Sequence, residues 1–449
     1  MADLLTNVWE SGSTDANTFQ FEERHREFAA EVRRFLHQDD ALKAWWSLCQ
    51  QKRSCDSVDR LQNEVNRAQH ELVQQMFRKG FMDVVPGYAW QGDAHPGGKV
   101  DLLYLYILIT EFSQTNIGFS AGLISSARIG LFPVLAAKGM QPAAREKVLR
   151  ACLCGDLNLA LCMSDPYAGS DVLATRTVAE RDDERGGWHI SGVKKWITGG
   201  IYADAFVVLA RVSVVGGAAG GKWARARAKE LSAFLVPRDA ANGVKVAWMD
   251  CQGASVSGTA RVTFDRTFVP QDALLGALGD GFALVMDGMV EERWCSGVSA
   301  LAMARTAARL MTGHMLRRKI GGRPFARMQI PRFRLANLLA RLEPLDLQAL
   351  HLARDIAETR NRGADAFRES PALAARAALF KVGAVRLAGD CVREAQLIFG
   401  GLAFERTGPG KDIARFADEL HGMHCAGGID DPLLDGAARA ALLGAGSKL

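Results

Sequence analysis

The chain has 449 residues, of which 48% are hydrophobic and 23% are charged, a composition typical of a globular protein with a substantial core. Lysine and arginine number 55 against 50 aspartates and glutamates, and this +5 surplus is too small for a nucleic-acid-binding protein while it suits an anionic ligand. The most apolar region falls short of the ~20 unbroken apolar residues of a membrane helix, so we expect neither nucleic acid nor membrane as a partner.

The amino terminus does not resemble a secretory signal. The nine cysteines are scattered without the spacing of a disulfide framework or a zinc ribbon. Free thiols in a reducing compartment are the simplest interpretation, so we expect a cytoplasmic protein without a metal site.

The first third of the chain has the apolar periodicity of helices. Residues 21–36 and 61–80 each place apolar side chains on one stripe, and residues 101–154 continue with apolar helical stretches. This pattern predicts an N-terminal helical domain over residues 1–155.

The pattern changes near Asp156, where short segments rich in β-forming residues follow one another with turn residues between them. Because no helices intervene, the pattern predicts an antiparallel sheet or barrel in a domain over residues 156–278. The expected strands are Leu157–Cys162, Thr175–Glu180, Trp188–Gly192, Ala205–Arg211, Leu231–Pro237, Val244–Asp250 and Ala260–Phe264.

Helical periodicity returns from Gly281, where Trp294, Val298 and Leu301 follow at steps of four and three. Long helices then run to about Gly400. The last domain, over residues 279–449, is therefore expected to be helical, and the whole chain to be an α+β multidomain protein.

Two motifs in the β-rich part indicate a family. Residues Leu161–Asp171 read LCMSDPYAGSD, and residues Gly192–Thr198 read GVKKWIT. Both resemble motifs of the acyl-CoA dehydrogenase family, Thr-Glu-Pro-x-Ala-Gly-Ser-Asp and Gly-x-Lys-x-Trp-Ile-Thr. Ser164 and Asp165 depart from the first motif. The resemblance implies three domains, helical, β and a C-terminal four-helix bundle.

The resemblance also implies FAD as the cofactor. A flavin needs an apolar face to stack on and a few hydrogen bonds at its polar edge, and a Trp and a Thr on one strand beside a loop of small residues can supply both. Ser170 would in addition lie near the CoA portion of the substrate. The residues implied to contact FAD from this part of the chain are Leu161, Met163, Ser164, Gly169, Ser170, Trp196, Ile197 and Thr198.

Two further segments resemble family motifs that serve a neighbouring subunit's FAD. Arg318 with Gln329 resembles the Arg-x-x-x-Gly…Gln segment, in which the planar arginine pairs with phosphate oxygens. Phe399, Gly400 and Gly401 resemble the Phe-Gly-Gly turn near the adenosine. The resemblance therefore implies a homodimer or homotetramer.

The C-terminal part is a divergent example of the family. Leu397 stands where a Gln usually precedes Ile-Phe-Gly-Gly, and Ala417 stands where an Arg precedes Asp418. Several adenosine-side contacts are therefore weakened.

The position of the catalytic base also differs from the common pattern. Most of the family carries a Glu eight residues after the Asp that matches Asp418, and this chain has Ala426 there, followed by Gly427. The isovaleryl and long-chain types instead carry a Glu-Arg pair on the helix that opens the last domain, which here is Glu292 and Arg293.

The resemblance thus implies that Glu292 removes the Cα proton of an acyl thioester while hydride leaves Cβ for the flavin. Ser170, Arg293, Ala426 and Gly427 are the implied substrate contacts. The thioester carrier is CoA or an acyl carrier protein, and an electron-transfer flavoprotein or another acceptor takes the electrons.

Other interpretations stay open from the sequence. A relative of the same fold that combines reduced flavin with oxygen, a monooxygenase or oxidase, often lacks the C-terminal Glu as well. A flavin-poor, non-catalytic member would tolerate the altered adenosine contacts. Asp418, His421, His424 and Cys425 have spacings that metal ligands use, but they lie in a segment that matches an ordinary helix of the family.

Overall fold

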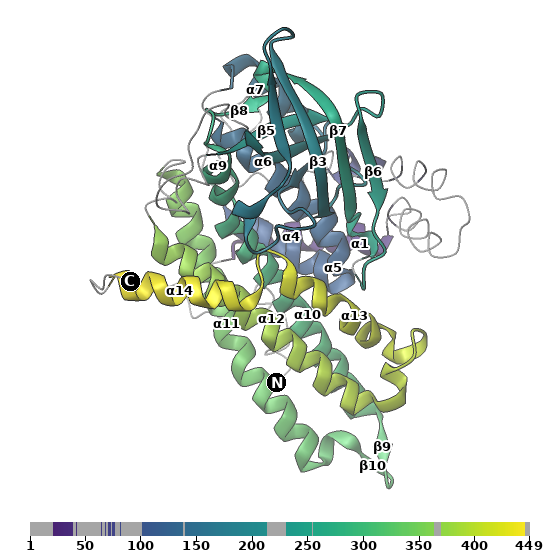
Figure 1. Ribbon diagram of the computed structural model, residues 1–449. Coiled ribbons are helices and arrows are strands. Elements are labelled where there is room, and N and C mark those ends of the chain that lie inside the picture. The colour runs from purple at the N-terminus through teal and green to yellow at the C-terminus, as the bar shows by residue number, and fades with distance from the viewer. Residues whose placement is uncertain are drawn as a thin grey trace.

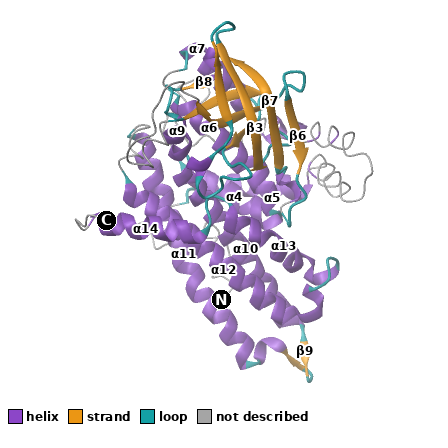
Figure 2. Ribbon diagram, in the orientation of Figure 1, coloured by secondary structure: helices purple, strands orange, loops and turns teal. Residues whose placement is uncertain are grey.

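The computed structural model describes residues 21–38, residue 42, a few positions between 64 and 81, and residues 101–444 except 138–139, 213–229, 254 and 363–369. Helices occupy both ends of this part of the chain, and strands lie between them (Figure 1, Figure 2). The order of helix, strand and helix expected from the sequence is confirmed.

In the N-terminal part, α1 packs against α4, whereas α6 packs against β1, α7 and α9. Helix α1 (Glu23–Gln38) buries the stripe that includes Val32. Helix α4 (Leu102–Thr115) is buried on nearly every side, because its side chains are apolar nearly all round. The other elements here are α5 (Ile117–Phe119), the π-helix η3 (Ser120–Ser125), α6 (Ser126–Ala136) and α7 (Pro142–Leu153).

Most of the helix expected over residues 61–80 lies outside the described residues. Leu72 and Met76, two positions of its apolar stripe, are fully buried.

The strands form a mixed sheet in the order β6-β7-β3-β2-β4-β5-β8, with β1 paired to β4. The antiparallel pairing expected from the sequence holds for most neighbours, whereas β1 and β2 each run parallel to β4, because crossing connections rather than hairpins join them to it. The strands are β1 (Leu159–Cys162), β2 (Val178–Asp182), β3 (Gly187–Ile197), β4 (Ala205–Val212), β5 (Leu231–Pro237), β6 (Val244–Trp248), β7 (Ala260–Pro270) and β8 (Leu274–Leu275).

Figure 1 shows the sheet at one end of three long helices, α10 (Met289–Arg317), α11 (Gln329–Asn361) and α12 (Pro371–Phe399). Their far end carries the two short strands β9 (Lys319–Ile320) and β10 (Arg323–Pro324). The remaining helices are α9 (Gly281–Asp287), α13 (Lys411–Cys425) and α14 (Asp430–Gly444), with short 3₁₀ turns η4 (Val172–Ala174), η5 (Ser255–Ser257), η6 (Gln271–Ala273), η7 (Phe325–Arg327), η9 (Gly400–Ala403) and η10 (Gly408–Gly410).

No helix in the described part of the chain combines the length and the apolar character needed to cross a membrane. Within the same residues, the cysteines carry free thiols.

A buried ion cluster of Arg128, Asp287, Glu291 and Arg360 ties α6, α9, α10 and α11 together. Arg360 donates to Glu291 and, at 2.7 Å, to the Asp287 carboxylate. Arg128 donates to the other oxygen of Glu291. All four residues are at most 5% exposed. Because two positive charges face two negative ones, the cluster is neutral inside the core.

We expect Arg360→Leu to destabilise the protein by about 3–5 kcal/mol, because it leaves two buried carboxylates without their shared cation. Arg354→Leu on the same helix is the matched control, since its 3.9 Å pair with Glu358 is exposed and worth about 0–1 kcal/mol. Urea denaturation of both variants measures the difference, and equal midpoints would contradict the role given to the cluster.

Candidate active site

Glu292 lies in the first turn of α10 and is only 7% exposed. Ser296, one turn later, offers its hydroxyl to the Glu292 carboxylate at 3.4 Å. Burial raises the pKa of Glu292 to about 7, and it outweighs the opposite effects of Ser296, Arg128 and Lys381. Glu292 is therefore a buried carboxylate that titrates near neutrality, not a solvated side chain on a helix surface.

The neighbouring Glu291 has a different environment. It points into the buried ion cluster, because the ~100° step between consecutive helical residues turns it away from Glu292. Burial alone would raise the pKa of Glu291, but the guanidinium groups of Arg360 and Arg128 hold it below its usual value. Glu291 is thus a structural anion that two arginines keep ionised, whereas burial raises the pKa of Glu292.

The segment that follows α13 lies beside Glu292. The side chain of Arg293 donates from Nε to the Gly427 carbonyl at 3.1 Å. A Cβ atom built on Gly427 would lie 3.7 Å from the hydroxyl of Ser296, the hydrogen-bond partner of Glu292. The structure therefore brings Glu292, Arg293 and the Ala426–Gly427 pair together, although more than 130 residues separate the two segments.

The loop after β1 is fixed to β3 by a buried lysine. Lys194 donates from Nζ to the Met163 carbonyl and to the Thr175 hydroxyl, both at 2.9 Å. Thr175 in turn donates to Asp165 at 2.8 Å, and the backbone N–H of Lys195 donates to the Ser164 carbonyl at 3.0 Å. The Asp165 carboxylate also accepts from the backbone N–H groups of Tyr167 and Arg176, at 3.0 and 2.6 Å.

Trp196, near the end of β3, combines an exposed side chain with an unusual backbone conformation. It is 49% exposed, and its φ of 60° lies in the left-handed region that few residues other than glycine adopt. The strain coincides with a shift of register between Lys194 and Ile197 in the pairing of β3 with β7. This bulge turns the indole outward, while Ile197 enters the core.

The remaining predicted contacts of the β-rich part divide into packed and open positions. Leu161 and Met163 pack against the buried cluster of Leu209, Leu231 and Val285, and Ser164 and Thr198 are half-buried. Gly169 and Ser170 are exposed, and a Cβ atom added to Gly169 would meet nothing within 4 Å. The backbone at Gly169 and the hydroxyl of Ser170 thus lie open at the surface.

Arg318, Gln329, Phe399, Gly400 and Gly401 lie at the opposite end of the long helices (Figure 1). At ~1.5 Å per residue, α10 separates Arg318 from Glu292 by about 40 Å. The ring of Phe399 stacks on His314 at 4.3 Å, which joins the ends of α10 and α12. We call this region the bundle tip. It is too distant to act on a ligand beside Glu292 of the same chain.

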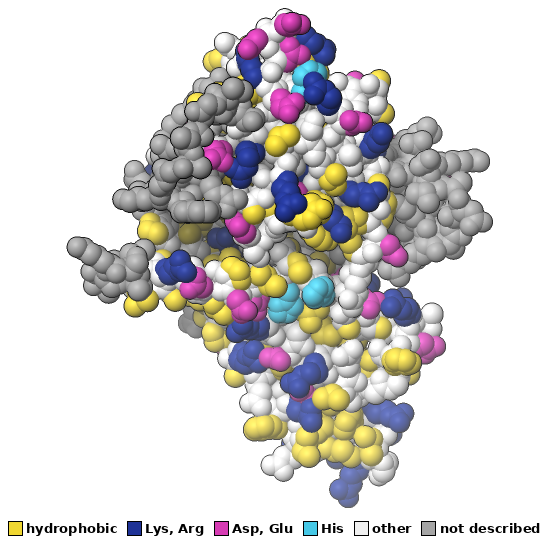
Figure 3. Space-filling view, in the orientation of Figure 1, with side chains coloured by type: hydrophobic (Ala, Val, Ile, Leu, Met, Phe, Trp, Pro, Cys, Tyr) yellow, Lys and Arg dark blue, Asp and Glu magenta, His cyan; other side chains and the backbone are white. Residues whose placement is uncertain are grey.

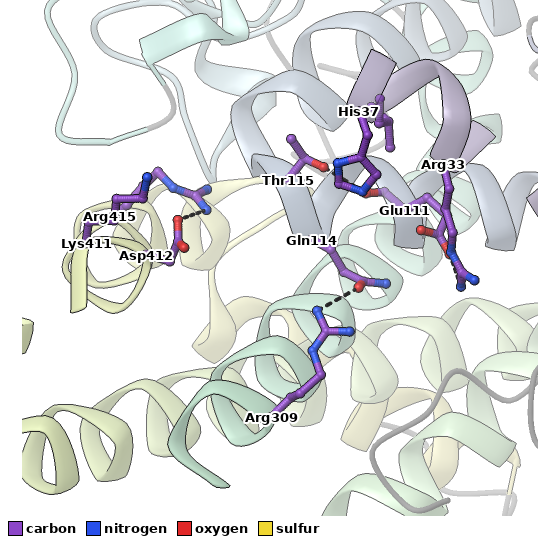
Figure 4. Close-up of a pocket in the computed structure, with 10 residues that line it drawn as sticks. Arg33, His37, Glu111, Gln114, Thr115, Arg309, Lys411, Asp412 and Arg415 are labelled. Atoms are coloured by element: carbon purple, nitrogen blue, oxygen red, sulfur yellow. Dashed lines mark hydrogen bonds and ion pairs between the residues drawn. The ribbon is translucent and has the colours of Figure 1, made fainter. Parts of the chain in front are cut away.

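A separate cavity of about 500 Å³ lies between α1, α4, α10 and α13. Figure 4 shows the side chains that line it. Arg309 donates to the Gln114 amide at 3.2 Å, and Arg415 pairs with Asp412 at 3.1 Å. Arg309 lies about 25 Å along α10 from Glu292, at ~1.5 Å per residue. This cavity is therefore distinct from the surroundings of Glu292.

Asp418, His421, His424 and Cys425 do not converge on one point. His424 contacts Asp430 at 3.3 Å, and Asp418 pairs with Arg406 at 2.6 Å. Within the described ranges, no three His, Cys, Asp or Glu side chains are placed to hold a metal ion.

Two residues of this site were missed in the sequence. Ser296 lies four residues after Glu292, a spacing that places both on one helical face and could have indicated it. Lys381 lies on α12, is fully buried and donates to two carbonyls at the end of α13. Its role depends on contacts distant in sequence, for which the chain offers no local signal.

Comparison with known proteins places these features in a family. A family model described as the acyl-CoA dehydrogenase middle domain matches residues 160–267, and one described as the acyl-CoA dehydrogenase C-terminal domain matches residues 279–442. Together they cover more than half of the chain.

Curated relatives agree. An acyl-CoA dehydrogenase of Emericella nidulans is 28% identical over 75% of this chain and 73% of its own length. The mitochondrial isovaleryl-CoA dehydrogenase of Oryza sativa subsp. japonica is 27% identical over 58% of this chain and 60% of its own length. The benzylmalonyl-CoA dehydrogenase of Aromatoleum aromaticum is 34% identical over 44% of this chain and 49% of its own length. The matched segments thus span about half to three quarters of these relatives.

Solved structures share the fold over nearly the full chain. Butyryl-CoA dehydrogenase from Megasphaera elsdenii superposes with a TM-score of 0.76 at 21% identity, over 94% of this chain and 99% of that chain. A glutaryl-CoA dehydrogenase from Mycobacterium smegmatis in complex with FADH2 gives 0.74 at 22% identity, over 94% and 95% of the two chains. On the evidence of the matched models and the shared fold, the chain belongs to the acyl-CoA dehydrogenase family.

Proposed function

We propose that this protein is an FAD-dependent dehydrogenase of an acyl thioester and that Glu292 removes the Cα proton. The observation that carries the proposal is a buried carboxylate with a pKa of about 7, placed beside the Ala426–Gly427 segment. Most other buried carboxylates of the described core are engaged by cations, as Glu291 is.

The residues present fit FAD. An exposed indole on a strained bulge supplies a planar apolar face, and the open backbone at Gly169 with the Ser170 hydroxyl supplies donors for polar atoms. Met163, Ser164 and Thr198 border the same surface. When bound, FAD accepts the hydride that leaves Cβ of the substrate.

The proton on Cα goes to Glu292. A base is most effective when its pKa lies near the working pH, and burial brings Glu292 to that range. The Ser296 hydroxyl and the nearby charges of Arg128 and Lys381 favour the ionised form, so the carboxylate remains available as an acceptor.

The thioester carbonyl needs a hydrogen-bond donor as negative charge develops on it. Ala426 has only a methyl group, so a backbone N–H of the segment after α13 takes this role. Arg293 holds that segment through the Gly427 carbonyl.

We propose CoA or an acyl carrier protein as the carrier of the acyl group, with Ser170 near the carrier, and an electron-transfer flavoprotein as the electron acceptor. A solved structure titled as an electron transferring flavoprotein of Acidaminococcus fermentans contains a chain of the same fold, at 21% identity and a TM-score of 0.75.

We further propose that the protein assembles as a homodimer or homotetramer in which the bundle tip contacts a partner's cofactor. Figure 3 shows hydrophobic side chains gathered at this end of the molecule. Ile330, Phe333 and Phe404 are 67%, 66% and 94% exposed there. Exposed apolar surface of this kind favours contact with a second copy.

We expect Glu292→Gln to slow flavin reduction by the substrate roughly 10²- to 10⁴-fold while FAD stays bound, because the amide is nearly isosteric but cannot accept the proton. Anaerobic stopped-flow measurement with a panel of acyl thioesters tests this. Glu419→Gln is the control, since it removes another buried carboxylate whose burial raises its pKa to about 7. A Glu292→Gln rate within a few-fold of the wild type would refute the assignment, and NAD(P)H-dependent oxygen consumption would favour the oxygen-using alternative.

The pH dependence of flavin reduction follows from the same group. Because the base acts in its ionised form and burial raises the pKa of Glu292 to about 7, the limiting rate should rise with pH through that value and level off above it. The expected curve has the slope of one proton. A rate that is flat between pH 5.5 and 8.5, values chosen about 1.5 units either side of this pKa, would contradict it.

Arg318→Ala should weaken FAD retention. A hydrogen bond to a charged group contributes about 1.5–3 kcal/mol, which corresponds to about 10- to 150-fold in affinity. Flavin absorbance after dialysis measures the loss. Arg317→Ala, which removes the neighbouring exposed guanidinium, should retain FAD. Equal retention in both variants would remove Arg318 from the cofactor site.

A further inference from the structure

A tight turn follows α13 at the site. Ala426 has φ −63° and ψ 138°, Gly427 has φ 66°, and the Gly428 N–H donates to the Cys425 carbonyl at 3.3 Å. These values define a type II turn, whose third residue needs a positive φ and is therefore usually glycine. We call residues 425–428 the site turn.

The hydrogen bonds of the site turn leave one backbone donor available. The Ala426 N–H donates to the Gly422 carbonyl at 3.0 Å and so completes the last turn of α13. The Gly428 N–H closes the turn itself. Among the described residues, no acceptor is recorded for the N–H of Gly427, which lies beside Ser296 and hence beside Glu292.

Two cations hold the carbonyl groups around this donor. Lys381 is fully buried and donates from Nζ to the His424 carbonyl at 2.7 Å and to the Gly428 carbonyl at 2.8 Å. Arg293 donates to the Gly427 carbonyl at 3.1 Å. Lys381 therefore holds the residue before the site turn and the last residue of the turn, and Arg293 holds its middle.

These bonds go to carbonyl groups and not to carboxylates. A buried ammonium ion is costly to desolvate, and hydrogen bonds to main-chain oxygens compensate for only part of that cost. Water or a C-terminal glycine could satisfy the carbonyl groups at this helix end without burying a charge. What the lysine adds is a fixed orientation of the site turn.

We propose that Lys381 is a positioning residue that, together with Arg293, holds the Gly427 N–H toward the thioester carbonyl. The inference rests on the proposed function. It adds the Gly427 N–H as the hydrogen-bond donor to the thioester and Lys381 and Arg293 as the residues that orient it. Lys381 bonds to the site turn and also favours the ionised form of Glu292 through its charge, so the test separates these two effects.

The effect should fall on the chemical step. A preorganised donor stabilises the charge that develops on the carbonyl in the transition state, so loss of its orientation lowers the limiting rate more than it weakens substrate binding. A displacement of about 1 Å costs on the order of 10²-fold in rate.

The test compares Lys381→Met, which keeps most of the stem but lacks the ammonium, with Lys381→Arg and the control Arg386→Met. Arg386 also lies on α12 and pairs with Asp430 at 2.9 Å, but it does not bond to the site turn. In Lys381→Met we expect the limiting rate of flavin reduction, taken on the high-pH plateau where Glu292 is ionised, to fall roughly 10- to 100-fold with a change in thioester Kd of less than about threefold. Lys381→Arg should recover part of the rate, and Arg386→Met should match the wild type.

Amide hydrogen exchange supplies a measurement that does not depend on turnover. Lys381→Met should exchange faster in the peptide that contains residues 425–428, while peptides of the β-rich part keep their wild-type rates. If Lys381→Met does not fold, Arg293→Met carries the same two measurements, since it releases the middle of the site turn.

The outcomes separate the two proposals. A wild-type protein that no thioester reduces would overturn the proposed function. A wild-type protein that is reduced, with Lys381→Met at an unchanged limiting rate and unchanged exchange, would overturn the role of Lys381 alone. A rise in Kd without a change in limiting rate would also overturn it, because it would assign Lys381 to binding.

Discussion

Two consecutive glutamates at the start of α10 are removed from water, and only one of them receives cationic partners. Glu291 is matched by Arg128 and Arg360 in a neutral cluster, which fixes α10 against α6 and α11. Glu292 keeps a hydroxyl as its hydrogen-bond partner, and burial therefore raises its pKa to about 7. Both carboxyl groups are buried, but their pKa values shift in opposite directions. The arginines beside Glu291 keep it ionised, whereas Glu292 has no such ion pair and its protonated form is favoured. The different protonation behaviour of the two glutamates follows from this difference in ion pairing.

Two buried lysines hold segments that are distant in the sequence by bonding to their carbonyl groups. Lys194 fixes the loop after β1 through the Met163 carbonyl, and Lys381 fixes the end of α13. Burial lowers the pKa of each lysine to about 8.

Much of the fold was predictable from the sequence because its signals are local. Strand β5 has the predicted bounds, Leu231–Pro237. Glu292 is buried, as expected for a base that replaces the Glu missing at Ala426. The parallel pairings of β1 and β2 with β4 were not predictable, since strand direction depends on connections and not on residue alternation. The bulge at Trp196 and the contacts of Lys381 were also not predictable from the sequence, because each depends on contacts between segments far apart in the chain.

The most direct measurement follows exchange of the substrate's Cα proton and requires no electron transfer to the flavin. An acyl thioester with sulfur in place of the Cβ carbon cannot lose hydride, but its Cα proton still exchanges with D₂O when an enzyme base removes it. NMR should show this exchange with the wild-type protein and its loss with Glu292→Gln at equal FAD content. Exchange that persists at the wild-type rate in Glu292→Gln would contradict the assignment of Glu292 as the base.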